Sequence, residues 1–467
     1  MLFNSLTFFY FFIVVLTVNY LLPLSKRNIW ILFISCIFYM SWSPPYILLL
    51  LFTALFDYFL ALKIDSSRDQ TTKKRWLILS LVFSLGSLAF FKYTTMAVES
   101  SQSILDLLGI AFILPSIEIT LPLGISFYTF ETISYTVDVY RGDLKPKKSF
   151  FEYLCFLMFF PKLIAGPIVR ASELLYQIPK PRLIEKAHIP EALNLLLLGF
   201  TKKILFADNI APFVEKVFAA PASSNRYMCI AAIYGYSMQV YLDFSAYTDI
   251  ARACAKFLGF QLPENFNKPY LATSISDFWR KWHMTLSRWL RDYLFIPLGG
   301  SKGGKILTYR NLMITMVLGG LWHGANWTFV AWGTLNGFFL VVEKIYYDYK
   351  GQKVPHGETM SLLEKLIRIV VVFHLITFTR IFFRSPDFKT ALTMMGSVIN
   401  PTSFTATDDF GLFAIPVFCI AYACLANLKP QLMAIKPKGF MNIFYGLWLF
   451  LLLALGASNA EFIYFQF

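Results

Sequence analysis

Charged residues are scarce in this sequence. Only 15% of its 467 residues are Asp, Glu, Lys or Arg, and 57% are hydrophobic. Soluble domains carry roughly 25% charged residues, so the composition argues against a soluble globular protein. At about 20 residues per crossing, the apolar runs predict an all-α integral membrane protein with roughly 10–12 transmembrane helices.

Long polar segments are missing as well. Polar stretches such as "KIDSSRDQTTKKR" (63–75) have only loop length. We therefore expect one membrane-embedded domain over residues 1–467. The net charge of +14 does not indicate a nucleic-acid partner, because the basic residues lie in short loops between apolar runs.

Motifs for disulfides, metals and common cofactors are also missing. The six cysteines are scattered and form no CxxC pair, which gives neither a disulfide framework nor a metal cluster. The sequence has no HExxH, Walker or dinucleotide-binding motif. We therefore predict no metal site and no permanently bound cofactor.

Basic loops predict how the chain faces the membrane. The first apolar run, residues 5–24, has no Lys or Arg before it and is followed by "SKR" (25–27). Two crossings later comes the basic loop 66–75. Because cytoplasmic loops are enriched in Lys and Arg, we expect a retained first span with its N-terminus outside and both loops inside.

Residues 274–300 have the periodicity of an amphipathic helix. At about 100° per residue, one face carries the charged residues Asp277, Arg280, Lys281, Arg288, Arg291 and Asp292. The other face carries Phe278, Trp282, Leu286, Trp289 and Tyr293. Such a helix suits the membrane interface. His283 falls at the edge of the apolar arc, where it would line a cavity or lie along the boundary.

A second histidine stands in the apolar stretch "GGLWHGANWTF" (319–329). Small residues beside His323 allow close helix packing, and Trp322 and Trp327 could wall a cavity. An imidazole that loses its hydration stays neutral more readily. A neutral imidazole can take a proton from a hydroxyl during acyl transfer. A packed structural histidine is the alternative interpretation.

Two carboxylates, Asp243 and Asp249, also lie near apolar sequence. Because an isolated charge within a membrane is costly, we expect both in structural ion pairs.

Taken together, these segments resemble a known family. The paired motifs "FWRKWHMTLSRWLRDYLFIPLGG" and "LWHGANWTFVAWGTLNG" are similar to those of the membrane-bound O-acyltransferase superfamily, in its bacterial alginate O-acetyltransferase branch. Further matching stretches are 122–142, 159–170, 241–270 and the terminal "EFIYFQF" (461–467). They occur in family order and span most of the chain.

The resemblance implies a fold and an activity. The expected fold is a ring of tilted helices around a central tunnel, with His323 as the catalytic residue and His283 assisting across the tunnel. A cytoplasmic donor, acetyl-CoA, would supply an acetyl group. A periplasmic acetyltransferase or acceptor protein would complete its transfer to an exported polysaccharide such as alginate. The expected location is the bacterial inner membrane, in contact with lipid.

Further residues are predicted to bind the donor or substrate. Trp322 and Trp327 would line the site, and Asn326 would orient the His323 ring or donate to the thioester oxygen. Arg280, Lys281 and Arg288 would meet the phosphates of coenzyme A, which is polyanionic. A charge band at the membrane interface is the alternative for these three residues.

Several alternatives stay open. His323 could act as a general base or be acetylated transiently. The same fold could serve acyl transfer to peptidoglycan or teichoic acid. In other classes, the chain could be a transporter, although it lacks two similar halves, or a scaffold of a secretion complex.

Overall fold

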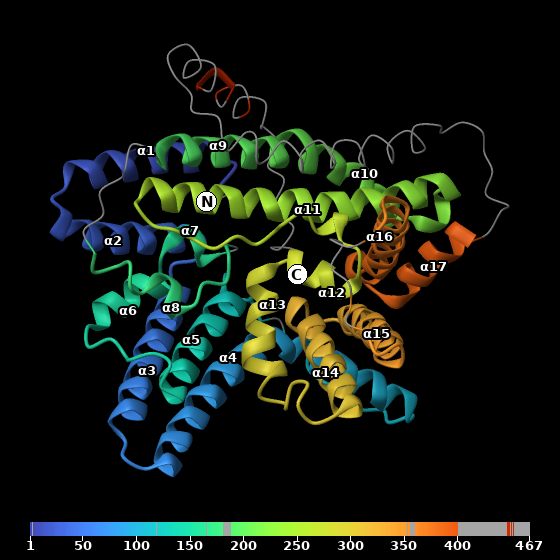
Figure 1. Cartoon of the computed structure of the whole chain (residues 1–467), viewed down its shortest axis with the longest axis horizontal. Coiled ribbons are helices and arrows are strands. Elements are labelled where there is room, and N and C mark those ends of the chain that lie inside the picture. The colour runs from blue at the N-terminus through green and yellow to red at the C-terminus, as the bar shows by residue number, and fades with distance from the viewer. Residues whose placement is uncertain are drawn as a thin grey trace. The chain divides into compact units, whose positions relative to one another are not determined.

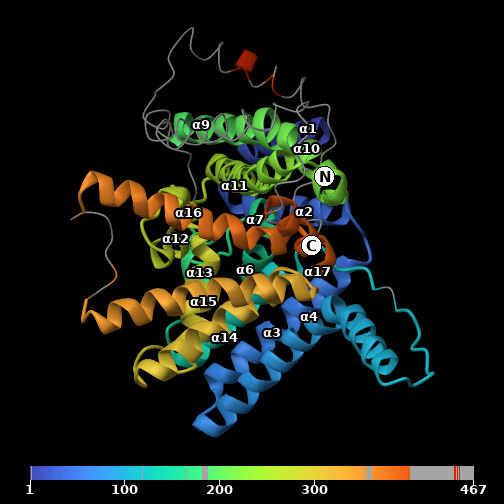
Figure 2. The same cartoon turned by 90° about the vertical axis from the view of Figure 1, so that its right-hand side faces the viewer.

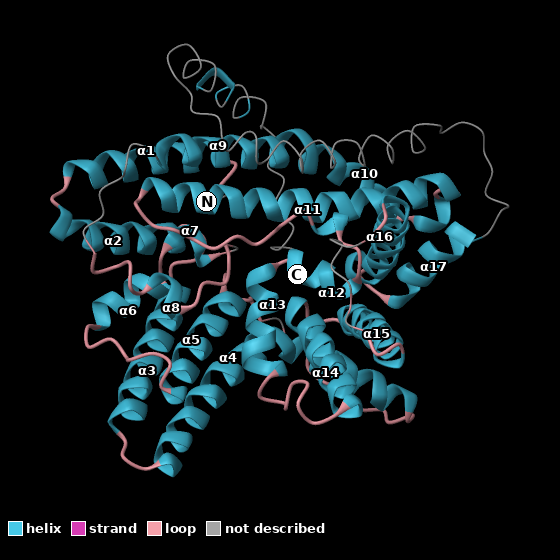
Figure 3. Cartoon of the chain, in the orientation of Figure 1, coloured by secondary structure: helices cyan, strands magenta, loops and turns pink. Residues whose placement is uncertain are grey.

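The computed structural model describes residues 1, 3–117, 119–164, 166–180, 188–352, 354 and 360–399, with 446–448, 450 and 452. Within these ranges the chain forms helices and loops and no strand (Figure 3). The all-α prediction is therefore confirmed for this part of the chain. The matching stretch 461–467 lies outside the described residues.

The chain divides into two compact units. Unit 1 comprises residue 1 with residues 7–185 and 254–263, and unit 2 comprises residues 2–6, 186–253 and 264–467. The single domain over 1–467 stays a prediction.

Unit 1 is built around three long helices. Its helices are α1 (Leu6–Leu21), α2 (Arg27–Met40), α3 (Tyr46–Ser66), α4 (Gln70–Leu107), α5 (Ile125–Arg141), α6 (Phe150–Leu157), α7 (Phe160–Leu163) and α8 (Ala171–Leu174). Helices α3, α4 and α5 pack on one another (Figure 1). Asp57 of α3 accepts hydrogen bonds from Ser80 and Ser84 of α4 at 2.7 and 3.1 Å, so hydroxyls from a neighbouring helix satisfy this buried carboxyl group.

Unit 2 carries the segments with the two candidate histidines. Its helices are α9 (His188–Phe200), the π-helical turn η2 (Thr201–Ala207), α10 (Asp208–Ala219), α11 (Arg226–Phe257), α12 (Ile275–Lys281), α13 (Met284–Leu290), the π-helical turn η5 (Arg291–Phe295), α14 (Lys305–His323), α15 (Trp327–Tyr349), α16 (Leu362–Arg384) and α17 (Phe388–Ile399). Helices α14 and α15 form a tightly packed hairpin, and α16 packs on α15 (Figure 2).

Three helices of the described part are long and apolar enough to cross a membrane. They are Tyr46–Ser66, Gln70–Leu107 and Leu362–Arg384, and Leu6–Leu21 and Phe388–Ile399 are shorter apolar helices. Residues such as Gly319, Gly320 and His323 in α14 lower its mean hydropathy. The figure of 10–12 crossings stays a prediction.

The prediction of a single amphipathic helix over 274–300 is wrong. The chain forms two short helices, α12 and α13, followed by η5, and the break falls at Trp282 and His283. The predicted charged face is also divided, because Asp277 is buried and caps its own turn. Local periodicity was compatible with one helix, but contacts from a preceding loop interrupt it.

The expectation that Asp243 and Asp249 form ion pairs is confirmed. The Lys203 ammonium lies 2.9 Å from Asp243 and 2.8 Å from Asp208. Lys202 lies 2.7 Å from Asp249. All five side chains are buried, so each charge is compensated within the protein.

Candidate active site

His323 is the last residue of α14 and is 7% exposed. The carbonyl end of a helix carries partial negative charge, which favours a cation placed there. A proton taken up by this imidazole would therefore be stabilised by the helix that holds it. The position suits a base that becomes charged for part of a reaction.

Two glycines set the distance between the helices that flank His323. A Cβ added at Gly320 of α14 would lie 2.3 Å from the carbonyl oxygen of Phe329 and 3.0 Å from the Cα of Gly333 in α15. A Cβ at Gly333 would lie 2.4 Å from the carbonyl oxygen of Met316. The prediction that small residues allow close helix packing here is confirmed.

Aromatic rings surround the His323 imidazole. The ring centroids of Trp322 and Trp332 lie 5.0 Å away, and that of Phe383 lies 5.2 Å away. Gly324 leaves room for the ring of Phe329, which a Cβ would meet at 2.1 Å. The imidazole therefore works in surroundings of low polarity, where interactions between charges are strong.

His283 occupies the break between α12 and α13. Its φ of 42° and ψ of 55° lie in the left-handed region, which is uncommon for a residue with a side chain. The side chain is fully buried, and its ring centroid lies 6.5 Å from that of His323 and 4.7 Å from that of Phe244. The structure therefore brings together the two histidines that the sequence singled out.

The loop before α12 holds this strained conformation. Asn265 accepts hydrogen bonds from the backbone of Met284 at 2.9 Å and from the Thr285 hydroxyl at 2.8 Å. The Asn267 N–H donates to the carbonyl of Lys281 at 2.9 Å. Bonds on both sides of His283 thus offset the cost of its backbone angles.

Burial also controls the charge of His283. Desolvation lowers the pKa of this imidazole to about 3, because water no longer stabilises the charged form. His283 lies outside the three candidate spans. We infer that the imidazole of His283 is neutral at physiological pH and that its role is to pack against the rings of Phe244, Trp322 and His323.

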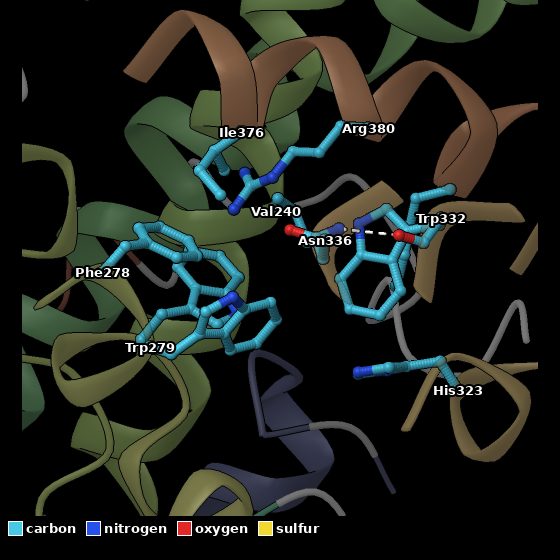
Figure 4. Close-up of a pocket in the computed structure, with 10 residues that line it drawn as sticks. Val240, Phe278, Trp279, His323, Trp332, Asn336, Ile376 and Arg380 are labelled. Atoms are coloured by element: carbon cyan, nitrogen blue, oxygen red, sulfur yellow. Dashed lines mark hydrogen bonds between the residues drawn. The ribbon is translucent and has the colours of Figure 1, made fainter. Parts of the chain in front are cut away.

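A small cavity opens beside His323. Its volume is about 20 Å³, which is room for roughly one water-sized group. Figure 4 shows His323, Trp279, Trp332, Asn336 and Arg380 around it, contributed by α12, α14, α15 and α16. The tunnel that the family resemblance implies stays a prediction.

Arg380 brings a positive charge to this cavity. It is 5% exposed and belongs to α16. It donates to the carbonyl of Ser237 at 2.9 Å and to the Tyr270 hydroxyl, and its guanidinium lies 4.2 Å from the ring centroid of Trp282. Neutral oxygens and aromatic rings thus hold the cation, which can stabilise negative charge that develops in the cavity.

Of the three residues predicted to surround His323, Trp322 lies beside it, whereas Trp327 and Asn326 do not line the cavity. Trp322 is buried beside both histidines, with its ring centroid 6.2 Å from that of His283. Trp327 is 55% exposed and does not line the cavity. The Asn326 side chain caps α15, because it accepts from the Thr328 N–H at 2.9 Å and donates to the Pro386 carbonyl at 2.7 Å. Its role toward a substrate stays a prediction.

The three predicted phosphate-binding residues also lie apart from the cavity lining. Lys281 is paired with Asp277 at 2.7 Å, Arg280 is exposed and Arg288 is half-buried. Their contact with coenzyme A stays a prediction.

Several cavity residues were not identified from the sequence. Arg380, in "TFTRIFF", carries a charge within an apolar run, which is by itself a signal of function. Asn336, in "GTLNG", is a buried amide within another apolar run. Trp279 is positioned by Glu343 of α15, which accepts from the first N–H groups of α12, those of Ile275 and Ser276, at 2.7 and 2.9 Å. No local pattern links Glu343 to that helix.

Comparison with known proteins identifies the family. The family model "MBOAT, membrane-bound O-acyltransferase family" matches residues 34–384. The chain is 37% identical to "Probable alginate O-acetylase AlgI" of Azotobacter vinelandii, over 91% of this chain and 84% of that protein. It is 38% identical to the protein of the same name from Pseudomonas aeruginosa, over 86% and 75%. It is 34% identical to "Peptidoglycan O-acetyltransferase" of Helicobacter pylori, over 86% and 80%. The chain therefore belongs to the membrane-bound O-acyltransferase family and is an O-acyltransferase.

Proposed function

We propose that this protein is a multi-pass O-acetyltransferase of the bacterial inner membrane that serves the O-acetylation of an exported polysaccharide. The donor is acetyl-CoA on the cytoplasmic side, and a periplasmic acetyltransferase or acceptor protein completes the transfer. The observation that carries the proposal is the position of His323, at the carbonyl end of α14 and beside a cavity that Arg380 also lines.

In the proposed mechanism, His323 is the general base. Its imidazole removes the proton of the acceptor hydroxyl while the hydroxyl oxygen attacks the thioester carbonyl carbon. The charge of Arg380 stabilises the resulting oxyanion. The carbon–sulfur bond then breaks, and the thiolate takes the proton back from the imidazolium. His283, buried and neutral, keeps Trp322 and His323 in place.

Alginate is the proposed acceptor, because the A. vinelandii and P. aeruginosa relatives are named as probable alginate O-acetylases. The H. pylori relative bears the name of a peptidoglycan enzyme, so peptidoglycan is the second candidate. Measuring acetyl esters on both polymers, with and without the gene, separates the two acceptors.

The decisive test is His323→Ala. Loss of a general base lowers the rate by roughly 100- to 10,000-fold, so we expect acetylation to disappear while the protein still inserts in the membrane. His374→Ala is the matched control, because His374 is exposed and its Nδ1 contacts only the Val370 carbonyl of its own helix among the hydrogen bonds described. Normal acetylation in His323→Ala would refute the proposal. An acetyl group found on His323 by mass spectrometry would show that the histidine forms a covalent intermediate instead of acting as a general base.

A further inference from the structure

Two polar atoms at the cavity lack a hydrogen-bond partner within the described part of the chain. They are Oδ1 of Asn336 and Nε1 of Trp279, and both residues line the cavity beside His323. Asn336 is 1% exposed. Leaving a buried polar atom unpaired costs stability, and such atoms in a native protein call for an explanation. A ligand that supplies the missing partners is one.

The orientation of the Asn336 amide is determined by its neighbour. Its Nδ2 donates to the carbonyl of Trp332 at 2.8 Å. In a flipped amide, the Asn336 oxygen would face the Trp332 carbonyl oxygen, and neither could donate. Oδ1 is therefore the amide atom that has no hydrogen-bond partner among the described residues. Figure 4 shows this oxygen on the cavity side and the hydrogen bond to Trp332 on the other.

The two atoms call for opposite partners. The indole N–H of Trp279 is a donor only, so it requires a ligand acceptor atom. Asn336 Oδ1 is an acceptor and requires a ligand donor. The proton of the attacking acceptor hydroxyl goes to His323 in the proposed mechanism, so it is not available to Asn336.

A thioester on a pantetheine arm supplies both partners. Its carbonyl oxygen is an acceptor, and the amide nearest the sulfur carries an N–H only a few bonds away. Arg380 lines the same cavity, where its charge favours an oxygen that becomes negative. The acetyl and amide groups exceed the present volume of about 20 Å³, so the side chains must move apart when the donor binds.

We propose that Trp279 and Asn336 form a recognition pair for the pantetheine thioester, an inference that rests on the proposed function. Trp279 donates to the thioester carbonyl oxygen, and Asn336 accepts from the amide N–H nearest the sulfur. When the hydroxyl oxygen bonds to the carbonyl carbon, the π electrons move onto the oxygen bonded to Trp279. Collapse restores the carbonyl and expels the thiolate, which takes the proton held by His323.

The test compares two donors on the full-length protein in lipid nanodiscs. One is acetyl-CoA, and the other is its analogue with an ester oxygen in place of the amide N–H nearest the sulfur. The wild type should bind the analogue about tenfold more weakly, as for the loss of one hydrogen bond to a buried partner. Asn336→Leu should bind acetyl-CoA about tenfold more weakly than the wild type and no longer distinguish the two donors.

Three other results would contradict the proposed role of Asn336 in the recognition pair. A wild type that binds acetyl-CoA and its ester analogue equally, or that binds neither acetyl-CoA nor an acetylated carrier protein, removes the role of Asn336. So does an Asn336→Leu protein that still discriminates tenfold between the two donors. A structural defect alone would weaken both donors by the same factor and leave their ratio intact. The assay measures binding, so it is separate from loss of acetylation in His323→Ala, which tests the proposed function.

Trp279→Phe tests the second member. It removes the N–H and keeps an aromatic ring, so acetylation should slow on the order of 100-fold, while the dissociation constant for acetyl-CoA changes less than about threefold. Unchanged acetylation would remove Trp279 from the pair. An acetylated carrier protein shares the arm with acetyl-CoA, so Asn336→Leu should weaken both by the same factor, and the wild-type affinities decide which is the donor.

Discussion

The contact between Gly320 and Gly333 gives the sharpest prediction about the site. In Gly320→Ala the new Cβ would lie 2.3 Å from the Phe329 carbonyl oxygen, whereas ordinary contacts begin at 3.4 Å. Helices α14 and α15 must therefore separate by about 1 Å, and overpacking of this kind costs about 1–3 kcal/mol. We expect a lower unfolding temperature in detergent.

The same displacement should also reduce the rate of acetyl transfer. His323 lies three residues after Gly320 on α14, and Trp332 directly precedes Gly333 on α15. Moving one helix by about 1 Å shifts the base relative to the cavity, and such a misplacement can cost roughly 100-fold in rate. Acetyl transfer by protein at equal folded concentration measures this effect.

Two further variants make the reasoning refutable. Gly86→Ala is the control, because a Cβ at this exposed position of α4 meets nothing within 4 Å. Gly333→Ala strains the same contact from the other helix, so the double variant with Gly320→Ala should lose less than the sum of the single losses. Activity within threefold of wild type in Gly320→Ala, or fully additive losses, would show that this contact does not position His323.

Three more predictions concern other parts of unit 2. Burial lowers the pKa of His283 to about 3 in the folded protein, against about 6.5 in the unfolded chain, so between these pH values only the unfolded chain binds the proton. The free energy of unfolding should therefore fall by about 1.4 kcal/mol for each pH unit from pH 6.5 down to 3. The thermal unfolding of His283→Phe should depend less steeply on pH than that of the wild type, and equal slopes would contradict this. Lys203→Met leaves the buried carboxylates of Asp208 and Asp243 without their shared cation and should lower the free energy of unfolding by about 3–5 kcal/mol; denaturant unfolding in micelles measures it, and a loss below about 1 kcal/mol would be inconsistent with a compensated cluster. Glu343→Gln weakens the hydrogen bonds to the start of α12 and should cost about 1–2 kcal/mol together with part of the acetylation rate, whereas activity and melting temperature both at wild-type values would exclude a positioning role.

The sequence alone located the two histidines. Polar groups within apolar runs are expensive, so His323 stood out without any knowledge of the fold. His283 stood out because it falls at the edge of the apolar arc of residues 274–300 and not on the charged face. The glycines beside His323 indicated close helix packing, which the Gly320–Gly333 contact confirms. Asp243 was expected to have a cationic partner for the same energetic reason, and Lys203 is that partner. Each of these inferences depends on the cost of burial, which composition and spacing reveal.

Tertiary structure alone decided how the site is assembled. The break at His283 depends on Asn265, a residue of a separate loop. The periodicity of residues 274–300 does not indicate this contact. The amide of Asn326 caps α15, a contact that the sequence did not indicate. Asn336 and Arg380 reach the His323 cavity from two different helices. Sequence periodicity reports which face of one helix is apolar, but which faces meet is determined by packing between distant segments.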